Sequence, residues 1–185
     1  MRKIRIIALY LECREWLGSD YAIRKKLDAG ELYRVGWGLY SDKPSPGLPE
    51  LAAKRYPAAV VAMDSAFFYQ GLTDVVPDRL HLATARDTTR IADRRIRQHF
   101  VPAAILDVGV AVIDWNGAPC RTYDLERLAI DAVRMRTKLP YELYKEVVLS
   151  LRARSAELYP AKIDDYLDAF PRRDSILASI EKEIF

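Results

Sequence analysis

Cationic and polar side chains gather in the stretch that follows Gly18. A nucleic-acid duplex presents phosphates, which cations neutralise, and base edges, which hydrogen-bonding side chains read. A helix that begins near Ser19 would direct its first residues at base edges and its free amides at a phosphate. The guanidinium of Arg24 has the fork that pairs with guanine, whereas lysines suit phosphates. The predicted DNA-contacting residues are Ser19, Asp20, Tyr21, Arg24, Lys25 and Lys26 on the helix, with Arg34 and Trp37 on a following hairpin.

Several of these residues also have a structural interpretation, which the sequence leaves open. Lys25 and Lys26 would equally form a solvated helix face. Trp37 would equally cover the core of a small domain, because its ring is large and mostly apolar. Tyr33 and Tyr40 favour a core or domain-interface position. Predicted core residues are Ile23, Leu27 and Leu32.

A second basic group lies in a polar stretch after a predicted strand. Residues 86–97 hold five arginines against two aspartates, a net charge of +3 that equals the formal charge of the whole chain. Such a group suits a polyanion, either as an extension of a DNA footprint or as a contact for RNA or a nucleotide. Surface charge paired with Asp87 and Asp93 is the alternative. The arginines are Arg86, Arg90, Arg94, Arg95 and Arg97.

Four charged residues fall on one predicted helix in the C-terminal half: Glu126, Arg127, Asp131 and Arg134. Arg127 and Asp131 are four positions apart and can therefore form an ion pair along the helix. Two interpretations remain open. The group is either an ion network that holds the helix to a sheet or a functional site of its domain.

Catalytic and metal-binding patterns are missing from the sequence. His81 and His99 are 18 positions apart without an HExxH pattern, and Ser65 lacks the glycines of a nucleophile elbow. Cys13 and Cys120 form no CxxC pair, which argues against a zinc site or a disulfide framework. Glycine-rich phosphate loops are also missing. We therefore expect no enzyme activity, no metal and no cofactor.

The elements that must position the first basic group begin with two predicted helices. An apolar stripe predicts a helix over Arg2–Trp16, and a shorter one follows over Tyr21–Ala29. Residues 31–42 alternate around a Gly36-Trp37-Gly38 turn, which indicates two short strands. The order helix, turn, basic helix and hairpin is typical of a winged helix-turn-helix. This domain is predicted over residues 1–43, before a proline-rich linker at 44–48.

The remaining residues, 49–185, predict a mixed α+β domain with a small, mostly antiparallel sheet and C-terminal helices. Helical patterns cover 49–56 and 58–72, although Val60-Val61 also suits a short strand. Strands are expected at 79–85, 96–101, 109–115 and 119–123, the last two around an Asn116-Gly117 turn. Four further helices follow, at about 125–138, from Pro140, at 163–170 and at 176–184.

Composition is that of a globular protein, with 50% apolar and 30% charged residues among 185. The apolar run Ile6–Leu11 is too short for a secretion signal or a membrane span. We therefore expect a cytoplasmic protein that does not contact the membrane.

Three stretches, in order, resemble the antitoxins of the abortive-infection AbiEi type. They are Tyr21–Ser41, which matches the family's winged helix-turn-helix; Asp64–Thr73, which matches its Ser-Ala…Gly-Leu-Thr segment; and Tyr123–Asp131, which matches its Glu-Arg-x-Leu-x-Asp helix. The family's module has three helices before the wing, whereas only 20 residues precede Tyr21 here.

The resemblance implies the antitoxin half of a type IV toxin–antitoxin pair. Such a protein binds its own promoter as double-stranded DNA, represses it, and counteracts a nucleotidyltransferase-like toxin without a tight complex. A homodimer on paired half-sites and a monomer both stay open. Two alternatives also stay open: a one-component regulator whose C-terminal domain senses a ligand or dimerises, and a protein-interaction antitoxin that does not bind DNA.

Overall fold

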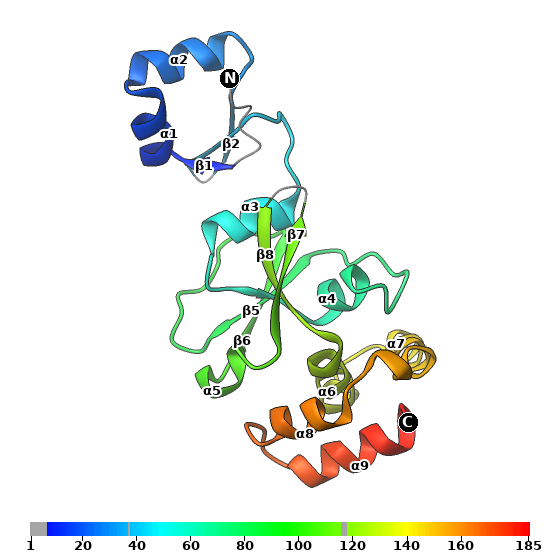
Figure 1. The fold of residues 1–185 in the computed structure, drawn as a ribbon. Helices are drawn as coiled ribbons and strands as arrows, with labels where there is room; N and C mark the ends of the chain where they lie inside the picture. Colours follow the sequence, from blue (N-terminus) through cyan, green and yellow to red (C-terminus); the bar gives the residue numbers. More distant parts are fainter. Residues whose placement is uncertain (1–6, 37, 116–117) are drawn as a thin grey trace. The chain divides into compact units, whose positions relative to one another are not determined.

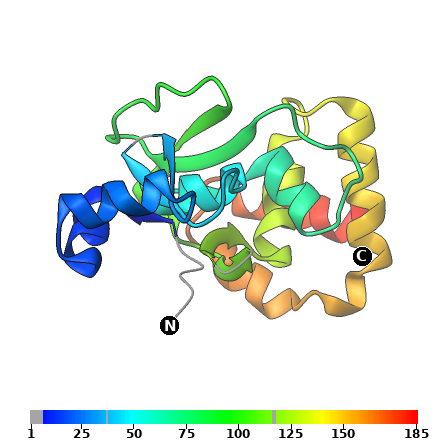
Figure 2. The ribbon, with the colours of Figure 1, turned by 90° about the horizontal axis from the view of Figure 1, so that it is seen from above.

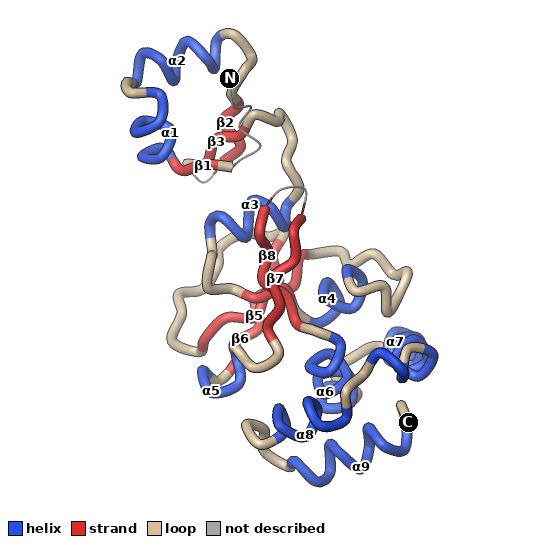
Figure 3. The backbone as a smooth tube through the Cα atoms, viewed as in Figure 1, coloured by secondary structure: helices blue, strands red, loops and turns tan. Residues whose placement is uncertain are grey.

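The structure, a computed structural model, describes residues 7–36, 38–115 and 118–185. It forms two compact units, one with the residues up to Ala58 and Val112–Cys120, the other with Ala59–Ala111 and Arg121–Phe185. Both units contain helices as well as strands (Figures 1 and 3), so the predicted α+β class is confirmed. The first compact unit extends beyond the predicted linker to Ala58, and the helix after that linker packs Leu51 into the first unit's core.

The first unit is built around a three-stranded antiparallel sheet in the order β1-β3-β2. One apolar cluster joins its two N-terminal helices to the sheet through Cys13, Ile23, Leu32 and Tyr40, which confirms Ile23 and Leu32 as core. The elements are β1 (Ala8–Leu9), α1 (Tyr10–Leu17), α2 (Asp20–Asp28), β2 (Tyr33–Gly36), β3 (Leu39–Ser41) and α3 (Leu48–Arg55).

The helix predicted from Arg2 to Trp16 is wrong for its described N-terminal part. Ala8 and Leu9 form strand β1, which pairs with Tyr40 and Leu39. The helix begins only at Tyr10, where the Leu9 amide donates to Glu12 Oε2 at 2.7 Å. Leu11, expected on the buried stripe, is 71% exposed. Strand pairing with residues some 30 positions away therefore outweighs the local helical period.

A five-stranded sheet in the order β6-β5-β4-β8-β7 belongs mainly to the second unit, although residues Val112–Cys120 of its β7–β8 hairpin are assigned to the first. Strand β4 runs antiparallel to β5 but parallel to β8, and β5 runs parallel to β6. The sheet is thus mixed and not mostly antiparallel. A long connection between β5 and β6 allows the chain to return and run in the same direction. The strands are β4 (Val60–Val61), β5 (Leu80–Ala85), β6 (Ile96–Val101), β7 (Val110–Trp115) and β8 (Ala118–Tyr123).

Helices in this unit pack against the sheet and one another. The segment 58–72 holds β4 before α4, so the short-strand alternative at Val60-Val61 is the correct one. Helix α6 contacts α4, α7, α8 and α9 and lies inside this group (Figure 2), which explains its almost fully buried surface. The helices are α4 (Met63–Tyr69), α5 (Ala103–Leu106), α6 (Leu125–Met135), α7 (Tyr141–Ala153), α8 (Pro160–Leu167) and α9 (Arg173–Glu183), with a short 3-10 turn at Ser155–Glu157. Among the described residues, none of the helices has the length and apolar character that crossing a bilayer requires.

Gly109 precedes β7 in a conformation that favours glycine, with φ at +73°. A Cβ built there would lie 2.5 Å from the Cβ of Arg127 and 2.9 Å from a ring carbon of Tyr166. We therefore expect Gly109→Ala to lower the free energy of unfolding by about 2–5 kcal/mol, through overpacking and backbone strain together. Urea unfolding followed by circular dichroism measures the loss. Gly71→Ala is the control, because φ is also positive there but its Cβ meets open space; equal losses would contradict the role assigned to the close approach.

Candidate nucleic-acid interface

The turn between α1 and α2 is built from local hydrogen bonds. Gly18 ends α1 with φ at +83° and donates its amide to the Arg14 carbonyl. Ser19 caps α2, because its hydroxyl accepts from the Ala22 amide at 3.2 Å. Tyr10 donates to Asp20 Oδ1 at 2.6 Å, and this bond raises the pKa of the tyrosine. Ser19 and Asp20, both predicted to contact DNA, therefore set the start and tilt of α2.

Helix α2 turns its apolar side inward and its cations outward. Ile23 is buried in the core of the first unit, and Leu27 packs against the same cluster. Tyr21, one turn from Arg24 and Lys25, is 77% exposed. Arg24 and Lys25 are exposed, and neither forms an ion pair with any residue that the structure describes. These three side chains are thus available to a partner.

Lys26 and Arg34, also predicted to contact DNA, are engaged within the unit. Lys26 Nζ lies 2.6 Å from Glu31 Oε2, and this pairing lowers the pKa of the glutamate. Arg34 donates to the Tyr40 hydroxyl at 3.1 Å, and its guanidinium lies 5.6 Å from the centre of that ring. Trp37 lies outside the described residues. Of the four predicted cations, Arg24 and Lys25 thus form no ion pair within the described residues, whereas Lys26 and Arg34 already have partners.

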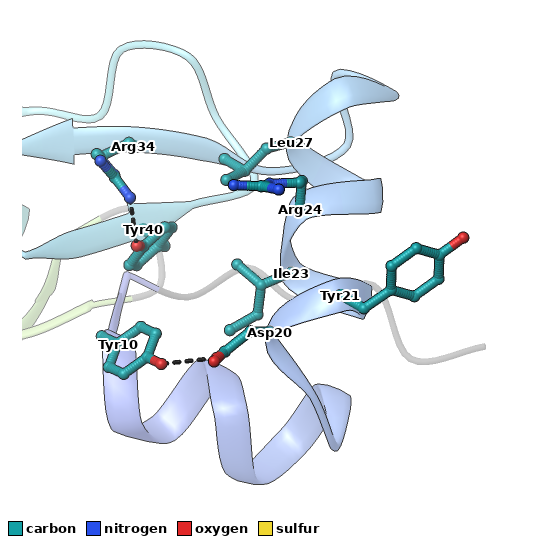
Figure 4. Close-up of a pocket in the computed structure, with 8 residues that line it drawn as sticks. All are labelled: Tyr10, Asp20, Tyr21, Ile23, Arg24, Leu27, Arg34 and Tyr40. Carbon is teal, nitrogen blue, oxygen red and sulfur yellow. Dashed lines mark hydrogen bonds between the residues drawn. The ribbon is translucent and has the colours of Figure 1, made fainter.

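A pocket of about 420 Å³ lies between α1, α2 and the β2–β3 hairpin. Figure 4 shows Arg24 extending from α2 toward the hairpin, where Arg34 points to Tyr40, while the ring of Tyr21 points away from the other side chains. Tyr10 and Tyr40 line it although the sequence did not predict them as site residues, and no local pattern marks residues that meet across 30 positions. The lining residues are Tyr10, Asp20, Tyr21, Ile23, Arg24, Leu27, Arg34 and Tyr40.

The second basic group lies in the loop between β5 and β6 and at the start of β6. Arg95 pairs with Asp93 at 2.9 Å, and this ion pair lowers the pKa of the aspartate. The other four members, Arg86, Arg90, Arg94 and Arg97, are exposed and form no ion pair within the described part of the chain. The surface-charge interpretation through aspartate pairing thus accounts for Arg95 alone.

The charged residues of α6 form a buried ion network. Arg127 donates through Nε to Asp131 at 3.1 Å, and Arg134 donates to the same carboxylate at 2.8 Å. Glu126 accepts from Lys162 at 3.1 Å and from the amide of Tyr159 at 3.3 Å. These contacts join α6 to α8, and Arg127 also donates to the carbonyls of Ile105 and Val108, which precede β7. They favour the structural interpretation of this group over a functional site.

His81, which is buried, and His99, which is half-buried, form a pair that the sequence did not predict. Their ring centres are 5.0 Å apart on the neighbouring strands β5 and β6, and His81 is 1% exposed. The nearest charge is Asp64, whose Oδ1 lies 3.5 Å from His81 Nδ1. Both ring nitrogens of His81 and Nε2 of His99 are buried without a hydrogen-bond partner among the described residues. The positive charge of a protonated histidine in this pair would thus have few polar groups to stabilise it.

Burial accordingly lowers the pKa of His81 and lowers that of His99 to about 4. The unfolded chain binds protons near pH 6.5, whereas the folded pair resists them. We therefore expect stability to be complete above pH 6.5 and to fall as the pH drops from there toward 4. Urea unfolding across this range measures the slope. His99→Leu should flatten it; equal slopes for variant and wild type would contradict the assignment.

The comparisons with known proteins give a similarity of fold. No protein-family model matches the chain. No curated protein matches it either. Among solved structures, the crystal structure of the RV2827C protein from Mycobacterium tuberculosis is similar, with a TM-score of 0.63 and 16% sequence identity over 94% of this chain and 72% of that one. The chain is therefore similar in fold, across both of its units, to this mycobacterial protein.

Proposed function

We propose that the first unit is a winged helix-turn-helix that binds the promoter of the protein's own operon. Helix α2 is the recognition helix in this proposal, and the β2–β3 hairpin is the wing. The order of elements supports it, since two helices joined by a capped turn at Gly18 are followed by a two-stranded hairpin. The protein would act as a repressor, and as the antitoxin of an AbiEi-like type IV pair.

The observation that carries this proposal is the free, outward face of α2. Arg24 and Lys25 are exposed without ion pairs within the described residues, and Tyr21 of the same helix is also exposed. Arg24 extends toward the hairpin that carries Arg34, so cations from two elements converge on one pocket. Arginine reads guanine edges, whereas lysine contacts phosphates without reading sequence.

The second unit is the proposed antitoxin domain, which counteracts a nucleotidyltransferase-like toxin. Support comes from the family-like segments Asp64–Thr73 and Tyr123–Asp131, which fall on α4 and on α6. Those helices contact each other, so two of the three resembling stretches meet in one core. Most charged side chains of α6 are paired in the ion network, so in this proposal α6 stabilises the domain and does not contact the toxin.

Fluorescence anisotropy of the whole protein tests the proposal. Labelled DNA from upstream of its own gene is compared with a scrambled duplex across a salt series. We expect tighter binding to the upstream DNA, with affinity falling as salt rises because cations displace counterions from phosphates. Equal, weak binding to both duplexes would overturn promoter recognition and favour an antitoxin that works by protein contact alone. Rescue of cells from the cognate toxin tests the second half of the proposal.

A further inference from the structure

We propose a second binding surface in the second unit, and that its ligand is a single-stranded nucleic acid. The surface, named here the arginine loop, comprises three exposed arginines of the loop between β5 and β6 together with Phe100 on β6. It lies within one compact unit and is independent of the proposed promoter interface. Its members are Arg86, Arg90, Arg94 and Phe100, whereas Arg97 falls on the opposite face of β6 from Phe100.

The arginine loop carries a net positive charge. Its three arginines form no ion pair within the described ranges. Of the two acids in residues 86–97, Asp93 is already paired with Arg95 at 2.9 Å, and Asp87 offsets only one positive charge. Exposed cations in one segment create a positive potential that raises the local concentration of a polyanion. The first requirement of a phosphate-backbone ligand is therefore met.

Side-chain hydrogen bonds hold this segment in place. Gln98 on β6 donates to Thr84 Oγ1 at 2.8 Å and to the Thr89 carbonyl at 3.3 Å, and its Oε1 accepts from the Ile91 amide at 2.8 Å. Gln98 thus connects the middle of the loop to β6, on which it lies, and to β5 by hydrogen bonds. Cations on an ordered backbone lose less freedom on binding than cations on a free loop.

The course of the chain spreads the arginines into a row. Strands β5 and β6 are parallel and in register from Leu80↔Ile96 to Ala85↔Val101, so the loop must return along their length. Six residues of strand span about 20 Å. Arg86 leaves the end of β5 and Arg94 precedes the start of β6. A row of this length follows a chain of phosphates better than it encloses a single phosphate.

The exposed ring of Phe100 favours a single strand over a duplex as the ligand. Its side chain is 46% exposed on β6, the edge strand of the sheet, opposite Thr84 in register. It therefore shares the face of Gln98 and lies at the Arg86 end of the loop. An exposed ring next to cations stacks on unpaired bases, which a duplex keeps stacked on one another.

Anisotropy with the whole protein and short labelled oligonucleotides tests this proposal. The probes are oligouridylate RNA, oligothymidylate DNA and a duplex without promoter sequence. The variant is Arg86→Gln/Arg90→Gln/Arg94→Gln, with Arg97 retained because its charge acts on His81 and His99. We expect at least about tenfold weaker single-strand binding and a salt slope shallower by about 2, since each lost phosphate contact removes about 0.7. The two single-stranded probes show whether RNA or DNA is preferred.

Matched variants separate this surface from general charge and from the promoter interface. Lys138→Gln/Lys145→Gln/Lys182→Gln removes the same charge from exposed lysines in the C-terminal region of the same unit, and should change binding less than about twofold. Phe100→Leu should weaken single-strand binding by roughly fivefold or more and leave the duplex unchanged. Arg24→Ala should not affect single-strand binding, so the two proposals fail separately. Equal losses of single-strand affinity in the two triple variants would overturn the proposal. Tighter binding of the duplex that Phe100→Leu does not change would also overturn it.

Discussion

Replacing Arg127 by methionine is expected to lower the free energy of unfolding by about 3–5 kcal/mol, because it breaks a buried ion pair on one side only. The side chain is 1% exposed. Its guanidinium donates to Asp131 at 3.1 Å and to the carbonyls of Ile105 and Val108, both at 2.6 Å, and lies 4.0 Å from the centre of the Tyr123 ring. Methionine fills much of the volume but leaves a carboxylate and two carbonyls without this donor. Urea unfolding measures the loss.

Arg134→Met is the matched control, because Arg134 binds the same carboxylate but its side chain is 29% exposed. Its expected loss is less than half that of Arg127→Met, since water replaces part of the interaction. Adding Asp131→Leu to Arg127→Met should restore part of the stability, because the buried carboxylate that lost one of its two donors is removed, while Arg134, whose side chain is 29% exposed, can turn to water. An Arg127→Met protein that unfolds like the wild type but no longer rescues cells would instead make α6 a functional site.

Replacing Arg24 by alanine is expected to weaken binding to the promoter by about 1–3 kcal/mol, roughly 5- to 150-fold, and to relax base preference at one position. Arg24 is exposed and pairs with no described acid, so its removal should leave the fold intact. Anisotropy with the upstream duplex and with single-base variants of it measures both effects. An unchanged affinity would remove Arg24 from the interface.

Two single-residue variants make this result specific. Lys25→Ala should weaken binding to all duplexes alike and lower the salt slope by about 1, as expected for a phosphate contact. Lys43→Ala removes the same charge from an exposed position outside α2 and should have little effect. If Lys43→Ala and Arg24→Ala weaken binding equally, the contribution of Arg24 is general electrostatic attraction and not base recognition.

Local signals were sufficient for most elements of this chain. Leu125, Leu128, Ala129 and Val133 share one helical face, and α6 forms there and buries it. Ser19 was expected to begin a helix and its hydroxyl does cap α2. The strands at 80–85 and 96–101 also follow from alternation. Caps and periodicity depend on residues within about one turn or two, which a single sequence displays directly.

Pairing between distant segments could not be predicted in the same way. Strand β1 forms inside a helical pattern because Ala8 and Leu9 meet β3, and the parallel course of β5 and β6 makes the sheet mixed. The meeting of His81 with His99 depends on that same strand pairing. Such contacts join residues far apart in the chain, and their free energy comes from packing that no local pattern records.

The candidate site shows the same division. Residue types and spacing identified the cations of α2 and of residues 86–97, because the charge of a lysine or arginine follows from its residue type alone. Tertiary contacts then selected among them: Lys26 is held by Glu31 and Arg34 by Tyr40, whereas Arg24 and Lys25 face outward without ion pairs within the described residues. An ion pair needs two charges within about 4 Å, and that distance is set by how the backbone folds.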